Sequence, residues 1–172
     1  MAPALPDRVD SAHLADNSMV LERVYPLSEM LRLQDMLADA RGSVRASFAF
    51  AKVDSGRAGA TVAVEATPQL VCQRCLQGFA YAAAGSSDIE FSSGSDEGAA
   101  HSPSEVYATN EGWVSLRELA EEELLLALPI VALHEPHACA QAQIYAAGAE
   151  AEDMSSDRSR PFSALQDLLK NT

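Results

Sequence analysis

The sequence predicts an α+β fold: an antiparallel, partly curved or barrel-like sheet with one long helix and one or two shorter helices. Three observations support this fold class. Apolar and polar residues alternate over much of 44–91, one amphipathic segment with its own cap follows at 115–128, and Gly, Ser and Asp residues separate the runs. The chain has 172 residues, 48% of them hydrophobic and 22% charged, which is typical of a globular domain.

The N-terminal part predicts a strand and then a helix. Residues 19–25 form a short run of β-compatible residues. From Met30 to Leu37, apolar residues recur at helical spacing, and Gly42 is suited to end a helix at its C-terminus. We therefore expect a helix of about three turns before Gly42.

A β-hairpin and a cysteine turn are predicted next. Residues 44–50 and 62–64 alternate in polarity on either side of a turn, which is typical of two antiparallel strands. Pro68 interrupts the second strand, which then continues to Cys72. An antiparallel meander that leads on through residues 79–91 is the simplest topology.

The long helix is the best-specified element of the sequence. Ser115 and Glu118 form a capping box, in which the Ser115 hydroxyl accepts from the Glu118 amide and the Glu118 carboxylate reaches back to the Ser115 amide. Glu121 and Glu122 are expected to lie mostly off the apolar face. Pro129 ends the helix at about the residue before it.

The chain is predicted to contain one domain and a C-terminal extension. Residues 18–140 form the single α+β domain. Residues 141–160 are rich in Ala, Glu and Ser, so we expect an acidic flexible segment. Residues 161–172 predict a short amphipathic helix with Phe162 and Leu165 on one side, and we expect it to fold back on the core because so short a helix is marginal alone.

The charge of the chain bears on its partners. There are 25 acidic and 12 basic residues, a formal net charge of -13, which disfavours direct binding to a phosphate backbone and suits a basic protein partner. The sequence has neither an apolar run of signal-peptide type near its N-terminus nor a stretch that spans a bilayer. We therefore expect a cytoplasmic protein without membrane partners.

Three cysteines suggest metal chemistry rather than a disulfide framework. Cys72 and Cys75 are spaced as two thiolate ligands of one zinc ion, and a structural site needs four ligands. Cys139, with His134 or His137, can supply the remaining ligands. Zinc is therefore the candidate cofactor, and the alternative is that the cysteines pack as small hydrophobic residues at a strand end.

A redox function of Cys72-Gln73-Arg74-Cys75 is disfavoured. Thiol–disulfide chemistry usually needs the first cysteine at a helix N-terminus, where the helix dipole lowers its pKa. Here the motif follows a predicted strand, and residues 76–79 predict a turn into another strand.

Other sequence features favour a binding protein over an enzyme. The chain contains no glycine-rich phosphate loop, no zinc-protease motif and no nucleophile elbow, so we expect neither catalysis nor a small-molecule substrate. A carboxylate at Glu123 intrudes on the apolar face and needs a hydrogen-bonding or cationic partner such as an arginine. The residues predicted to bind a protein partner are Arg74, Glu121, Glu122, Glu123, Leu124 and Leu125.

The sequence resembles the YceD family of bacterial and plastid proteins, which is associated with accumulation of large-subunit ribosomal RNA. The similarity spans roughly residues 20–170 and is most specific in two blocks, Leu70 to Leu76 and Leu119 to Val131, followed by His134 and Cys139. The order and content of the two blocks together carry the resemblance. The C-terminal segment at 161–169 is also similar to the end of that family.

The resemblance implies a non-enzymatic factor in ribosome large-subunit biogenesis. Such a factor would support accumulation or processing of large-subunit ribosomal RNA through a ribosomal protein or an rRNA-processing factor. The alternatives are direct binding of structured ribosomal RNA through Arg45, Arg57 and Arg74, and a zinc or redox Cys-x-x-Cys protein. Some relatives carry further cysteines after the helix, where this chain has only Cys139.

Overall fold

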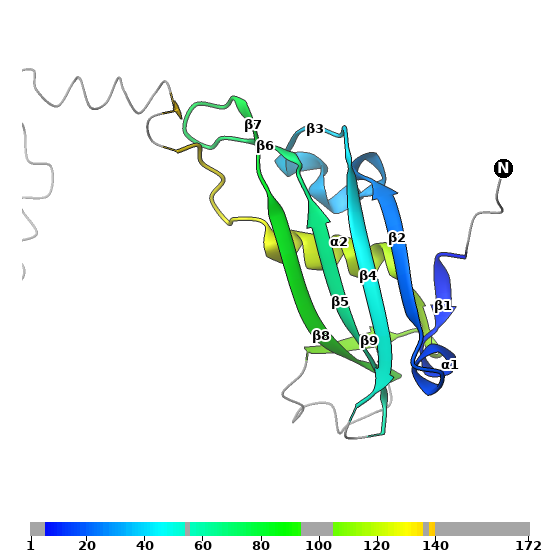
Figure 1. Cartoon of the computed structure of the whole chain (residues 1–172). Coiled ribbons are helices and arrows are strands. Elements are labelled where there is room, and N and C mark those ends of the chain that lie inside the picture. The colour runs from blue at the N-terminus through cyan, green and yellow to red at the C-terminus, as the bar shows by residue number, and fades with distance from the viewer. Residues whose placement is uncertain (1–5, 54–55, 94–104, 136–137, 140–172) are drawn as a thin grey trace, which may run out of the picture. The chain divides into compact units, whose positions relative to one another are not determined.

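The computed structural model describes residues 6–53, 56–93, 105–135 and 138–139. The chain divides into two compact units, Met1–Glu135 and Pro136–Thr172, and the fold below is that of the first. Figure 1 shows its elements, which are β1 (Arg8–Asp10), α1 (Ser11–Asp16), β2 (Val20–Pro26), the 3-10 helices η1 (Leu27–Glu29) and η2 (Leu31–Met36), β3 (Leu37–Asp39), β4 (Ser43–Lys52), β5 (Ala58–Ala66), β6 (Gln69–Val71), β7 (Gly78–Ala80), β8 (Ala83–Ser93), β9 (Glu105–Thr109), β10 (Trp113–Ser115) and α2 (Leu116–Ala127).

The main sheet has five strands in the order β2-β4-β5-β8-β9. The strands from β2 to β8 in this order are antiparallel to their neighbours, and the predicted hairpin is confirmed by the pairing of β4 with β5, in which Phe48 lies opposite Val62. β9 lies beyond the predicted meander and was not predicted as a strand; it runs parallel to β8 after a long connection. The α+β class is confirmed, and the sheets are not closed into a barrel.

Helix α2 packs across one face of this sheet, against β5 and β8 (Figure 1). Along β4 the side chains alternate between buried and exposed, because successive residues of a strand point to opposite faces. The buried side supplies Phe48 and Phe50, and the helix contributes Leu119 and Leu124. This two-layer core orients the surface of α2 and the chain that follows it.

Close approach of α2 to β8 depends on Gly85. A Cβ atom at this position would lie 2.7 Å from Oε1 of Glu123 and 3.1 Å from Cβ of Ala127. The Ser87 hydroxyl on the same strand donates a hydrogen bond to the buried Glu123 carboxylate. The hydrogen-bonding partner that Glu123 needs is therefore a serine of the sheet rather than the suggested arginine.

The predicted helix at residues 30–37 is wrong. The chain instead forms η1 and η2, in which Leu27, Met30 and Leu33 are fully buried at intervals of three residues. That interval matches the three residues per turn of a 3-10 helix better than the α-helical period. Gly42 has a φ of +101° and its carbonyl accepts from the Leu27 amide at 3.1 Å, so it closes a loop rather than ends an α-helix.

Two elements precede residue 18, where the predicted domain begins. Strand β1 pairs with β10, and α1 follows it at once. The Asp10 carboxylate caps α1 by accepting from the amides of Ala12 and His13 at 3.0 and 3.1 Å. The predicted segments 141–160 and 161–172 lie outside the described residues.

The long helix begins and ends as predicted. The Ser115 hydroxyl accepts from the Glu118 amide at 3.3 Å, and α2 ends at Ala127, two residues before Pro129. One detail was wrong: Glu121 is buried rather than off the apolar face, and its Oε1 accepts from the Arg32 amide at 2.6 Å. Among the described residues, no helix has the length and hydropathy needed to cross a membrane.

Candidate metal centre

The cysteine motif forms a tight turn between β6 and β7, two strands of a separate three-stranded sheet. The Cys72 amide donates to the Gln77 carbonyl at 2.9 Å, and the Leu76 amide donates to the Cys72 carbonyl at 2.8 Å. Leu76 has a φ of +59°, in the left-handed region, which lets the chain reverse just after Cys75. The motif therefore lies in a strand-to-strand turn and not at a helix N-terminus, the position that redox chemistry favours.

The chain that follows α2 is held against this turn. The Gln73 amide donates to the Ala132 carbonyl at 2.9 Å, and the Gln73 side chain donates to the Ile130 carbonyl at 3.5 Å. The ring of His134 then packs on Phe79 of β7, with the ring centroids 4.8 Å apart. These contacts place His134 beside the two cysteines, although about sixty residues separate it from them in sequence.

Three potential ligands converge in the first unit. Cys75 Sγ lies 3.3 Å from His134 Nδ1, and the ligand atoms of Cys72, Cys75 and His134 all lie within 4.8 Å of one another. Ligands of one tetrahedral zinc ion lie about 3.5–3.8 Å apart, given the usual zinc–sulfur and zinc–nitrogen distances. The spacing and the soft sulfur and nitrogen donors therefore fit a zinc-type ion.

The environment of Cys72 favours its thiolate form. Burial of the thiol acts to raise its pKa, but hydrogen bonds from the backbone of His134, Cys75 and Arg74 and from the Cys75 side chain outweigh burial and lower the pKa from 9.0 to about 6. A thiolate is the form that binds a metal ion. The turn thus fixes the position of Cys72 and also favours the thiolate form that a metal ion binds.

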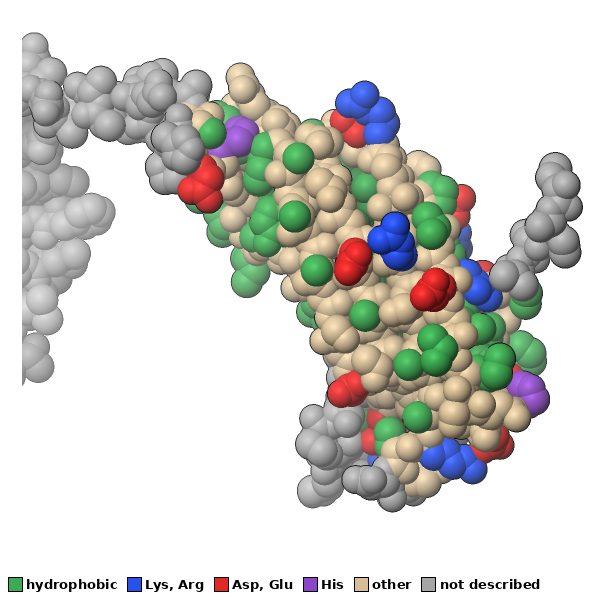
Figure 2. Space-filling model, in the orientation of Figure 1, with side chains coloured by type: hydrophobic (Ala, Val, Ile, Leu, Met, Phe, Trp, Pro, Cys, Tyr) green, Lys and Arg blue, Asp and Glu red, His purple; other side chains and the backbone are tan. Residues whose placement is uncertain are grey.

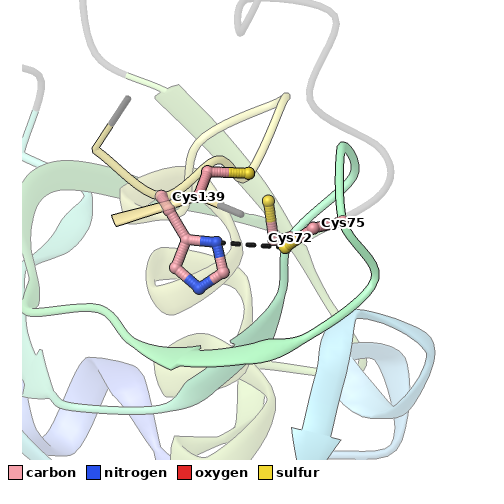
Figure 3. Close-up of side chains that lie close together, drawn as sticks. Cys72, Cys75 and Cys139 are labelled. Carbon is pink, nitrogen blue, oxygen red and sulfur yellow. Dashed lines mark hydrogen bonds between the residues drawn. The ribbon is translucent and has the colours of Figure 1, made fainter. Parts of the chain in front are cut away.

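The two other predicted ligands lie in the second unit of the chain. Cys139 lies five positions after His134 in the sequence. Within the first unit, Figure 3 shows Cys72 and Cys75 on the turn. His137 lies outside the described residues.

The predicted partner-binding residues differ in exposure. Glu121, Glu123 and Leu124 are buried, while Arg74, Glu122 and Leu125 are partly exposed. Burial gives the first three a packing role in the folded chain, and partner binding by the set stays a prediction. Sequence reasoning did not identify Gln73 and Phe79 as residues that position His134, because neither carries metal chemistry.

Two of the three arginines of the RNA-binding alternative, Arg45 and Arg57, lie beside carboxylates. Arg45 lies 3.5 Å from Glu65 on the neighbouring strand, and Arg57 forms an ion pair with the buried Glu90. Figure 2 shows the sheet face opposite α2, where Lys and Arg side chains lie singly rather than gathered in a patch. The buried pair reduces the positive charge that Arg57 offers to a phosphate backbone, whereas the pair of Arg45 is exposed and weak.

Comparison with known proteins agrees with the resemblance seen in the sequence. Residues 60–169, more than half of the chain, match the model of a family described as large ribosomal RNA subunit accumulation protein YceD. No curated protein and no solved structure gave a significant match. The matched region includes the cysteine turn, helix α2 and His134. The chain therefore belongs to the YceD family.

Proposed function

We propose that this protein is a non-enzymatic factor in ribosome large-subunit biogenesis, which supports accumulation or processing of large-subunit ribosomal RNA through a protein partner. The observation that carries the proposal is the family match over residues 60–169. The net charge of -13 supports a basic partner, such as a ribosomal protein or an rRNA-processing factor. Cytoplasmic localisation is part of the proposal.

Action through a protein partner is better supported than direct binding of RNA. The chain has about twice as many acidic as basic residues, and Arg57 is paired with the buried Glu90. Phosphate contacts supply most of the affinity in sequence-independent RNA binding. A gel shift with purified large-subunit RNA separates the two: tight, salt-dependent binding at physiological salt would favour direct RNA contact.

We further propose that a zinc ion is a structural component of the protein, held by Cys72, Cys75, His134 and Cys139. A structural zinc site is closed by four protein ligands, and the turn with His134 supplies three. Cys139 is the candidate for the fourth, since the five-residue chain after His134 can span up to about 17 Å. Bound zinc would neutralise thiolate charge and cross-link the turn to the chain after α2, with no open position for catalysis.

Depletion of the protein tests the proposed function. Large-subunit ribosomal RNA should fall relative to small-subunit RNA when the protein is removed, and a plasmid copy should restore it. Normal RNA levels after full depletion would contradict the proposal. Rescue by a Cys72→Ser variant, compared with the Ser86→Ala variant of the exposed sheet face, then shows whether the cysteine turn is needed.

Zinc content tests the metal proposal separately. Freshly purified protein should hold roughly one zinc ion per chain, as a single four-ligand site requires. Cys139→Ser should reduce the content if Cys139 is a ligand, whereas the neighbouring Ala138→Ser variant should not. Equal zinc contents in these two variants would remove Cys139 from the ligand set, and no zinc in the unmodified protein would end the proposal.

A further inference from the structure

An acidic and apolar stripe runs along the exposed side of α2 and onto the chain that follows it. We define this acidic–apolar stripe by five residues: Glu118, Glu122, Leu126, Ile130 and Val131. The first three are spaced by four residues and so share one side of the helix. Figure 1 shows the chain continuing from the end of α2 toward β6 and β7, where Gln73 holds the Ile130 and Ala132 carbonyls.

The apolar end of the stripe is unusually exposed. Leu126 is 64% exposed, Ile130 95% and Val131 53%, although they follow one another within six residues. Single exposed apolar residues are ordinary, but a contiguous group of large ones marks an interaction surface. The hydrogen bonds from Gln73 fix this segment, so these side chains are presented by an ordered backbone.

The other end of the stripe carries negative charge. Tyr107 of β9 lies beside it, and its pKa is raised first by burial and then by the charges of Glu118 and Glu122. Arg32 is the described cation nearest to Glu122, at 3.9 Å, and both side chains are well exposed, so the pair is weak and exchangeable. The two carboxylates therefore keep most of their attraction for a partner's cations.

A small hollow joins the acidic and apolar ends. Tyr107, Leu119, Glu122, Glu123 and Leu126 are among its lining residues, and its volume is about 20 Å³. That volume holds one water-sized group, such as the ammonium of a lysine. The buried Glu123 carboxylate accepts from Ser87 and has further lone pairs to accept from a cation.

From this charge and shape we propose that the stripe docks a basic amphipathic segment of a partner protein, with its apolar side on Leu126, Ile130 and Val131 and its lysines over Glu118, Glu122 and the hollow. Buried apolar centres flanked by complementary charges are the general pattern of such grooves. The inference deepens the proposed function, on which it rests, by assigning the surface and the chemistry of the partner.

The experiment is a titration of the full chain with a synthetic amphipathic peptide that has leucines on one helical face and lysines on the other. The same peptide with acetylated lysines keeps the shape and removes the charge. We expect the unmodified peptide to bind, more weakly as salt rises, and the acetylated peptide to bind at least about fivefold more weakly. Equal binding of the two peptides would overturn the charge complementarity.

Variants locate the binding surface. Ile130→Ser and Glu122→Gln should each raise the dissociation constant at least about fivefold, because each removes a central contact. Val24→Ser and Glu65→Gln are the matched controls on the opposite sheet face, and Val24 is as exposed as Leu126, at 64%. The proposal is overturned if the control variants weaken binding as much as the stripe variants.

Two other occupants of the stripe are also tested. If sedimentation shows self-association that Ile130→Ser abolishes, a second copy occupies the surface and the proposal is wrong. If Leu165→Ser in the full chain strengthens peptide binding, the chain's own C-terminal segment competes for the stripe, which is equally contrary to it. If the level of ribosomal RNA stayed normal after depletion while the peptide still bound, the proposed function would be wrong and the docking surface would stand.

Discussion

The Asp7 carboxylate accepts a hydrogen bond from the Arg117 amide at 3.0 Å, and so ties the N-terminal segment to the first turn of α2. The same carboxylate accepts from the hydroxyls of Tyr25 and Ser115, at 3.0 and 2.8 Å. The Asp7 carbonyl accepts from the Leu116 amide at 3.0 Å. Asp7, which precedes β1, therefore accepts hydrogen bonds from the N-terminal amides of α2, the helix that carries the acidic–apolar stripe.

Asp7→Ala should lower the free energy of unfolding by about 2–3 kcal/mol, because it removes three hydrogen bonds and a negative charge at a helix N-terminus. Chemical denaturation monitored by circular dichroism measures this. Asp16→Ala is the control: Asp16 pairs with Lys52 at 2.6 Å, but both side chains are more than half exposed, so the change should stay within about 0.5 kcal/mol. Equal losses in the two variants would contradict the role of Asp7.

Tyr25 should make the protein less stable at alkaline pH. Burial first, and then the hydrogen bond to Asp7 and the Asp7 charge, raise the Tyr25 pKa above its ordinary value of 10.0. The folded state then holds this proton more tightly than the unfolded state, so the stabilisation is complete below pH 10 and is lost as pH rises above it.

Tyr25→Phe tests this by removing the titrating group. The variant should lose about 1 kcal/mol at pH 7, with the hydrogen bond, and should show a shallower fall in stability above pH 10 than the unmodified protein. Tyr107, whose pKa is also raised, leaves part of the slope in place. Denaturation curves at several alkaline pH values measure the slope, and an unchanged slope would rule out Tyr25 as its source.

Zinc removal should destabilise the protein without changing its helical content at low temperature. Most of the described core lies in the main sheet and α2, away from the cysteine turn, so the fold should persist while the melting temperature falls. A chelator titration followed by thermal melting measures the shift. Cys72→Ser should melt at the chelated temperature and be insensitive to chelator; a chelator effect of normal size in that variant would place the metal elsewhere.

Leu76→Gly should stabilise the protein by about 0.5–1 kcal/mol, because glycine adopts a positive φ without the steric cost that a leucine bears. Leu76 is 77% exposed, so little burial is lost. Leu31→Gly is the matched control, since Leu31 is 76% exposed but lies in a 3-10 helix and is not among the positive-φ residues. The control should be destabilised, and a loss of stability in both variants would show that Leu76 is unstrained.

The sequence predicted the elements whose signals are local. The Ser115 cap and Pro129 define α2 within a few residues, and alternation defines β4 and β5. The 3-10 segment at 27–36 was mistaken for an α-helix because apolar spacings of three residues occur in both. The parallel pairing of β9 and the structure before residue 18 depend on long-range contacts, such as those of Asp7, which no local pattern encodes.

The sequence pointed to the residues of the candidate site, but not to the contacts that bring them together. Cys72, Cys75 and His134 were identified by residue type, since thiol and imidazole groups bind zinc. Their convergence depends on Gln73 backbone bonding and on the Phe79 ring, and these interactions carry no sequence signature. The apolar exposure of Ile130 was likewise hidden, because an apolar residue after a helix is equally compatible with burial.

Gly85 and Glu123 are distant in the sequence but pack so closely that the side chains at the two positions compete for the same space. Any side chain at residue 85 would compete for space with the Glu123 carboxylate and Ala127, so the Glu123 side chain or α2 itself would have to shift. A shift of α2 would also carry Glu122 and Leu126, which lie on the same helical turns. The position of the acidic–apolar stripe on α2 thus depends on the lack of a side chain at Gly85, on the sheet beneath the helix.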